Sequence, residues 1–164
     1  MNTDRLNDWL QVIGLFGIIA SLVFVGLEMR QAKEIAIANA SQARTATAVD
    51  LVTAIASDPV IRAALIKQRT GNTEAMSADE QTALSSIAYA NLLLQEDIYH
   101  QYIGGFVTED KWQGSRSSLK TGLSDRTRGP FLRTTYDFTS TMWSPSFTAL
   151  VEQLVLEIET EQPK

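Results

Sequence analysis

The stretch WLQVIGLFGIIASLVFVGL, residues 9–27, carries no charged side chain and is bracketed by Asp8 and Glu28. As a helix it spans about 28 Å at 1.5 Å per residue, close to the roughly 30 Å hydrocarbon core of a bilayer. Twelve of its residues are Leu, Ile, Val or Phe, and together they contribute on the order of −4 to −7 kcal/mol to insertion. The segment therefore predicts a transmembrane helix, with Trp9 and Arg30 at the membrane interfaces.

Two other interpretations of this segment fit less well. A buried core helix rarely stays uncharged over five turns. A cleaved signal peptide has a positively charged leader and a small-residue cleavage site, whereas the leader MNTDRLND has little positive charge and charged residues begin again at Glu28. We therefore expect a short flank at 1–8, an anchor at 9–27 and a helical soluble domain at 28–164.

Basic residues around the anchor give a weak orientation signal. Arg30, Lys33 and Arg44 follow the segment, against Arg5 before it. Because basic loops stay on the cytoplasmic side, this bias favours a domain in the cytoplasm.

The overall charge limits the classes of partner. The chain has 164 residues and a net charge of -5, with its Lys and Arg residues scattered. A nucleic-acid-binding protein needs a basic stripe to meet phosphates, so we expect no nucleic acid partner. Cysteine is absent, which excludes disulfides and thiolate chemistry.

Small residues mark one face of the anchor. Gly14, Gly17 and Ser21 stand at i, i+3 and i+7, a spacing that lets a second helix approach closely within a membrane. The pattern predicts a homo-oligomer, although glycines are also common in transmembrane helices for other reasons.

The rest of the chain reads as all-α. No Gly or Pro lies between Gly26 and Pro59, so the anchor is expected to continue as one long helix to about Ser57. Five shorter helices, packed as a bundle, are expected after it. They start at Ser57-Asp58-Pro59, at a Ser77–Glu80 capping box, at Thr108, at Pro130 and at Ser144-Pro145, and the first four end near Gly71, Gly104-Gly105, Gly122 and Met142.

Helical spacing of apolar residues predicts two inward faces. Residues 123–130, LSDRTRGP, read as a loop or a short turn. The two expected inward faces are Leu84, Ile87, Asn91, Leu94, Ile98 and Tyr102 in the helix after Ser77, and Phe147, Leu150, Val151, Leu154 and Ile158 in the last helix.

No motif for catalysis or metal binding survives inspection. His100 follows Glu96 and Asp97 as in half of a di-iron helix-bundle site, but the second half would need another histidine and the chain has one. A surface pairing with Glu96 or Asp97 is the simpler role. The paired carboxylates Glu109-Asp110 and Glu157/Glu161 read as solvated helix faces. We expect no enzymatic activity, no catalytic residue, no metal and no cofactor.

Three stretches carry a resemblance to a family. They are residues 14–34, GLFGIIASLVFVGLEMRQAKE; residues 96–119, in which Glu96, Tyr99, Tyr102, Gly105 and Trp112 form an E-x-x-Y-x-x-Y…G…W pattern; and residues 143–154, WSPSFTALVEQL. The chain resembles a family of uncharacterised bacterial single-pass membrane proteins with a C-terminal helical domain of unknown function. The resemblance implies one anchor in the bacterial cytoplasmic (inner) membrane and no assigned activity. Gly104 departs slightly from the pattern.

The aromatic residues of these stretches have two interpretations. Tyr99, Tyr102, Trp112, Trp143 and Phe147 either line a ligand pocket or, more commonly for such residues, form the core that joins the helices.

Three functions remain open at this level. The first is a non-enzymatic scaffold in the lipid bilayer that self-associates through Gly14, Gly17 and Ser21. The second is an accessory subunit bound to other membrane proteins. The third is a membrane-tethered sensor that binds a small molecule among the aromatic residues.

Overall fold

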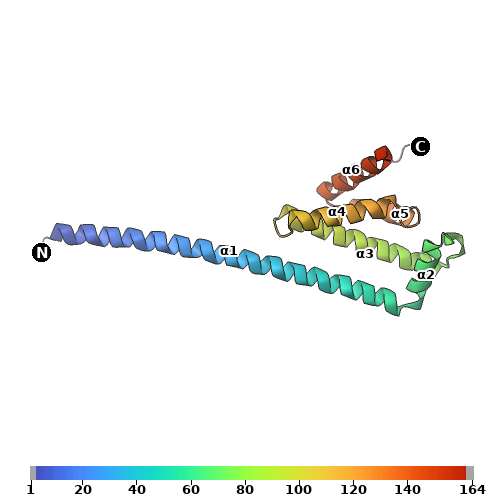
Figure 1. The fold of residues 1–164 in the computed structure, drawn as a ribbon, viewed down its shortest axis with the longest axis horizontal. Coiled ribbons are helices and arrows are strands. Elements are labelled where there is room, and N and C mark those ends of the chain that lie inside the picture. The colour runs from blue at the N-terminus through green and yellow to red at the C-terminus, as the bar shows by residue number, and fades with distance from the viewer. Residues whose placement is uncertain (1–2, 162–164) are drawn as a thin grey trace. The chain divides into compact units, whose positions relative to one another are not determined.

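A computed structural model describes residues 3–161 of the chain, and side chains from residue 9 onward. Within these residues the fold is all-α with no strand, which confirms the fold class expected from the sequence: one long N-terminal helix and five shorter α-helices (Figure 1). The chain divides into two units, residues 1–45 and 46–164.

Helix α1 runs without a break from Thr3 to Ser57 and passes straight through Gly26. Among the described helices it is the one long and apolar enough to cross a membrane. Every side chain of residues 9–27 is exposed. The helix ends where Asp58 and Pro59 start the next one, because proline cannot continue a helix whose preceding turn it would clash with.

Helix α2 (Pro59–Arg69) begins and ends as its sequence predicts. The Asp58 side chain accepts hydrogen bonds from the backbone N–H groups of Val60 at 2.7 Å and Ile61 at 3.1 Å. These two donors have no partner within the helix, so the cap satisfies them. Gly71 lies just past the end with φ 73°, a left-handed conformation that glycine adopts without strain.

Helix α3 (Ala78–Ile103) follows the short 3₁₀ turn η1 (Thr73–Ala75). Its start is the expected capping box, in which Ser77 and Glu80 each bond the other's backbone N–H. Glu80 also accepts a 2.7 Å bond from Lys67 Nζ, which ties α3 to α2.

The last helices are α4 (Glu109–Ser124), α5 (Gly129–Phe138) and α6 (Pro145–Glu161), with a 3₁₀ turn η2 (Ser140–Met142) before α6. Thr108 precedes α4 as expected, but its side chain makes no capping bond. Helix α4 ends at Ser124, close to the end expected near Gly122, whereas the end expected for α5 near Met142 was wrong, because α5 stops at Phe138.

In the stretch 123–130, residues 125–128 form a turn outside the helices, as expected, whereas 123–124 end α4 and 129–130 begin α5. This close turn explains why glycine stands at Gly129. A Cβ there would lie 2.6 Å from the carbonyl oxygen of Leu123, too close for any side chain. The early end of α5 has a tertiary cause, because η2 returns the chain so that Trp143 stacks on Tyr136 with ring centroids 6.1 Å apart.

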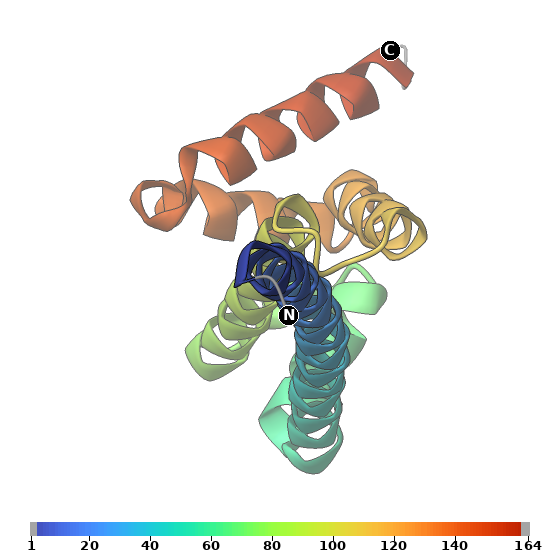
Figure 2. The same ribbon diagram turned by 90° about the vertical axis from the view of Figure 1, so that its left-hand side faces the viewer.

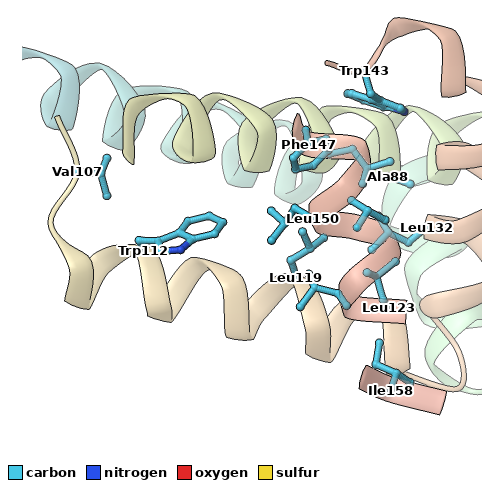
Figure 3. Close-up of a cluster of buried hydrophobic side chains, with 13 residues drawn as sticks. Ala88, Val107, Trp112, Leu119, Leu123, Leu132, Trp143, Phe147, Leu150 and Ile158 are labelled. Atoms are coloured by element: carbon cyan, nitrogen blue, oxygen red, sulfur yellow. The ribbon is translucent and has the colours of Figure 1, made fainter. Parts of the chain in front are cut away.

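Within residues 46–164, α2 and α6 lie on opposite sides of α3, α4 and α5 (Figures 1 and 2). The main core is built where α3, α4, α5 and α6 meet, and Figure 3 shows side chains of α4 and α6 pointing toward one another. The inward face expected for α6 is confirmed, since all five of its residues are buried. They are Phe147, Leu150, Val151, Leu154 and Ile158.

The inward face expected for α3 is confirmed at its two ends, where Leu84 is buried and Ile98 and Tyr102 pack against the main core. In the middle of the helix the buried residues are Ala88, Leu92 and Gln95, whereas the expected Asn91 is exposed. The run Leu92-Leu93-Leu94 makes this helix apolar on most sides, so spacing alone does not define one face. Packing against three neighbouring helices selects Leu92, which is fully buried.

Candidate functional site

The expected self-association face lies on α1 with no cover from the described part of the chain. Gly14, Gly17 and Ser21 are exposed. A Cβ added at Gly14 or Gly17 would meet no atom within 4 Å. A second helix could therefore approach this face as closely as its own side chains allow.

The expected interface residues lie at the two ends of the apolar segment. Trp9 is 68% exposed. Arg30 Nε lies 3.4 Å from Glu34 Oε1, in a pair whose side chains are largely exposed. Such an exposed i,i+4 pair stabilises a helix by a few tenths of a kcal/mol at most, so it holds the Arg30 side chain only weakly.

The five aromatic residues named above come together in space, and we call them the aromatic junction. Tyr102 stacks on Trp112 with centroids 5.1 Å apart, and Tyr99 lies 5.2 Å from Trp112. Phe147 lies 6.2 Å from Tyr99 and 5.7 Å from Trp143. Phe147, Trp112 and Trp143, labelled in Figure 3, are almost completely buried, so the junction is a packed core between α3, α4 and α6.

Polar atoms of the junction are satisfied at its edge. The Tyr102 hydroxyl donates a 2.6 Å bond to Glu109, which also accepts from Gln113. The bond to the carboxylate raises the pKa of Tyr102, and the donors from Gln113 and Tyr102 lower the pKa of Glu109. Glu109 is exposed, as its sequence context indicated, and it also binds the Tyr102 hydroxyl at the edge of the core.

His100 and Ser144 form a contact that resembles part of a hydrolase site. His100 Nε2 lies 3.0 Å from Ser144 Oγ and 3.7 Å from Glu96 Oε1. In a catalytic triad the carboxylate binds the other ring nitrogen and so orients the histidine. Here both partners face Nε2, and Ser144 Oγ also accepts a bond from the Phe147 backbone N–H at 3.3 Å. The group therefore caps α6.

Glu96 completes this cap from α3. Its carboxylate accepts the backbone N–H of Ser144 at 2.8 Å, across 48 positions of sequence. The contact joins the E-x-x-Y stretch to the W-S-P stretch, because the first supplies the acceptor and the second the helix start. Sequence reasoning paired His100 with Glu96 but missed Ser144.

The carboxylates considered as an acid–base pair on α6 are held in ion pairs. Glu157 contacts Arg116 and lies 3.1 Å from Lys120 Nζ, which also lies 2.7 Å from Glu161. These donors lower the pKa of Glu157, and the two carboxylates raise the pKa of Lys120. The group fastens α6 to α4.

A groove in the second unit was not expected from the sequence. It has a volume of about 670 Å³ and lies among the end of α1 and helices α2 to α5. Apolar side chains make most of its wall: Val52, Ile55, Leu65, Leu84, Ile87, Ala88, Leu119, Phe131 and Leu132. Pockets that hold small molecules are typically about 300–1,000 Å³ and mostly apolar, with a few placed polar groups.

Five polar residues of the groove come from three parts of the fold. Gln68 and Arg69 end α2, Asn91 lies on α3, and Asp125 and Arg128 lie between α4 and α5. The sequence offered a signal only at Asn91, a polar residue at an apolar spacing. Among residues 3–161, no three His, Asp or Glu side chains gather as a metal site.

Comparison of the chain with protein-family models, with curated proteins and with solved structures found no match. The resemblance to uncharacterised bacterial single-pass membrane proteins therefore stays a prediction.

Proposed function

We propose that the protein is a non-enzymatic scaffold of the bacterial cytoplasmic membrane, anchored by residues 9–27 and assembled from copies of itself through α1. The observation that carries the anchoring is the complete exposure of an uncharged apolar helix of 19 residues. Soluble monomers rarely leave an apolar patch of more than a few hundred Å² in water. A bilayer covers such a helix on all sides and leaves none of its backbone groups unsatisfied.

Alkaline carbonate extraction of cell membranes tests the anchor. The wild-type chain should remain in the pellet. The double variant Ile18→Lys with Leu22→Lys costs about 5–7 kcal/mol of insertion, comparable with the whole apolar gain, and should move the chain to the supernatant. Met29→Lys, just beyond the segment, is the matched control and should remain in the pellet. Release of the wild-type chain by carbonate would contradict the anchor.

The basic flank after the anchor supports a cytoplasmic domain. A green fluorescent protein fused after Lys164 should then fluoresce, and alkaline phosphatase fused at the same place should be inactive. The opposite pair of results would reverse the orientation.

The open small-residue face of α1 supports self-association. Native mass spectrometry of the full-length protein from its own membranes should give multiples of 18.1 kDa. Gly17→Leu with Ser21→Leu should shift it toward the monomer, because bulky side chains keep the helices apart. Gly26→Leu is the control, since this position lies about 150° around the helix from the face.

Two results would redirect the proposal. Unchanged mass after Gly17→Leu with Ser21→Leu would exclude this face as the contact. Unrelated membrane proteins in fixed ratio would make the chain an accessory subunit of a larger complex.

The non-enzymatic part of the proposal is supported by how the reactive side chains are used. Ser144 caps α6 and both His100 and Glu96 face its cap. Glu157 and Glu109 are held by donors from neighbouring helices and the junction. Each of these groups already has a structural task.

A further inference from the structure

The groove contains a polar side chain that is buried and has no protein partner. Gln68 is 5% exposed and lines the groove, yet no hydrogen bond to its side-chain amide occurs among residues 3–161. The enclosed side-chain atoms without a partner in the described residues are Arg44 Nη1 and Gln101 Oε1. The Gln68 amide is not one of them, so it is reached from the groove and can form hydrogen bonds with a molecule that binds there.

The charges of the groove favour an anion. Its charged residues are Arg69, Arg128 and Asp125. Asp125 Oδ1 accepts three bonds of 2.8–2.9 Å, from the backbone N–H and hydroxyl of Thr127 and from the backbone N–H of Arg128. These donors hold its pKa far below the ordinary range of a carboxyl, so its charge is fixed in capping the turn into α5.

The guanidinium groups of the two arginines have few contacts within the protein. Arg128 Nη2 lies 3.5 Å from Asp125 Oδ2, a long and exposed contact, and no ion pair holds Arg69 in the described part of the chain. Guanidinium groups bind carboxylates and phosphates with two parallel hydrogen bonds. The chain as a whole has a net charge of -5. A groove lined by two guanidinium groups therefore differs from the rest of the protein in its charge and favours anionic ligands.

The apolar residues of the groove indicate that the rest of the ligand is hydrophobic. Leu84, Ile87, Phe131 and Leu132 are apolar residues that line the groove, and Leu84 and Leu132 are largely buried in its wall. We propose that this groove binds a small amphipathic anion, with its apolar body against these residues and its oxyanion head, a carboxylate or a phosphate ester, at Arg69, Arg128 and Gln68. The site is distinct from the aromatic junction, and it does not depend on self-association of α1.

Photolabelling tests this site in the full-length chain, held in phosphatidylcholine nanodiscs. The probe is a twelve-carbon carboxylate with a terminal aliphatic diazirine, and modified residues are mapped by mass spectrometry. Labelling of the bilayer segment 9–27 is an internal reference for the amount of probe. Groove residues such as Ile87 and Phe131 should be labelled at low probe concentration. Labelling confined to residues 9–27 would overturn the proposal.

Competition identifies the head group. Dodecanoate or dodecyl phosphate should reduce groove labelling, whereas dodecyltrimethylammonium, an amphiphile with a cationic head, should leave it unchanged. A stronger effect of one anion distinguishes a fatty-acid-like carboxylate from a lipid-like phosphate. Equal competition by the cation would overturn the oxyanion assignment.

Arginine variants test the recognition chemistry. Arg69→Gln with Arg128→Gln should lower groove labelling about tenfold at subsaturating probe, since one charge-assisted bond has about that effect on affinity. Arg62→Gln with Arg126→Gln removes the same charge from exposed positions outside the groove and should leave labelling unchanged. If both double variants lost groove labelling equally, the net charge of the protein would account for the effect, and the proposed site would be overturned.

A filling variant tests the space itself and carries little folding risk. Asn91 is exposed at the wall of the groove, so Asn91→Trp should occupy the groove and abolish its labelling while the far-ultraviolet circular dichroism stays unchanged. Asn72→Trp, outside the groove, is the control. Full labelling of Asn91→Trp would overturn the proposal.

Discussion

Truncation of Phe147 should be among the most damaging single changes in this protein. The side chain is fully buried at the first turns of α6, with the rings of Tyr99 and Trp143 against it. Phe→Ala in a packed core costs about 3–5 kcal/mol, because the surrounding residues relax only partly into the cavity. Two ring contacts place this site near the middle of that range, so we expect a loss of about 4 kcal/mol.

Thermal unfolding followed by tryptophan fluorescence measures this loss directly. Trp112 and Trp143 both lie in the junction that the change disturbs, so the signal reports unfolding of the core. For a unit of this size about 3–5 °C of Tm corresponds to 1 kcal/mol. Phe147→Ala should therefore unfold about 12–20 °C below the wild-type protein in the same nanodiscs.

The same truncation on the outer face of α6 is the matched control. Leu156 is 63% exposed, and surface substitutions usually change stability by less than about 0.5 kcal/mol. Leu156→Ala should therefore shift Tm by no more than about 2 °C. A loss for Phe147→Ala no larger than that for Leu156→Ala would refute the packing of α6 onto α3 and α4.

Three further changes test local features by the same Tm measurement. Asp58→Ala removes the cap of α2 and should cost about 1 kcal/mol, whereas Asp58→Asn keeps an acceptor and should be nearly neutral; equal losses would contradict the cap. Gly71→Ala places a Cβ at φ 73° and should cost about 1 kcal/mol, with Gly71→Asn less harmful; an unchanged Tm would contradict the left-handed turn. The hydrogen bond from Lys67 is the main cause that lowers the pKa of Glu80 from 4.5. Because the pKa of Glu80 is lower in the folded than in the unfolded protein, the stability that the Lys67–Glu80 bond contributes is present above about pH 4.5 and is lost as the pH falls through the folded pKa. The difference in Tm between the wild type and Lys67→Met should therefore become smaller in acid. A difference that does not change with pH would contradict this linkage.

Features that depend on residues close together in the chain could be predicted from the sequence. The anchor segment 9–27 follows from a run of uncharged residues whose length matches a bilayer, and the long helix follows from the absence of Gly and Pro up to Pro59. The cap at Asp58, the capping box at Ser77 and the left-handed Gly71 each involve neighbours within a few residues. Such short-range contacts do not depend on how the rest of the chain folds.

The end of α5 and the middle of the buried face of α3 could not be predicted from the sequence. Helix α5 stops at Phe138, and Trp143 beyond it stacks on Tyr136. Ala88 and Leu92 face inward although Ile87 and Asn91 have an equally good spacing. In each case two local choices are nearly equal, and burial against another helix decides between them.

The sequence by itself determined the class of the fold, the apolar segment, the helix starts and the residues of the aromatic junction, because each rests on spacing or on a short-range contact. Only the tertiary structure decided what those residues do. It joined Glu96 to Ser144 across 48 positions and placed Gln68, Arg69 and Arg128 at one groove. Residues so far apart in the chain meet only when the core folds, and no local preference encodes the distance between them.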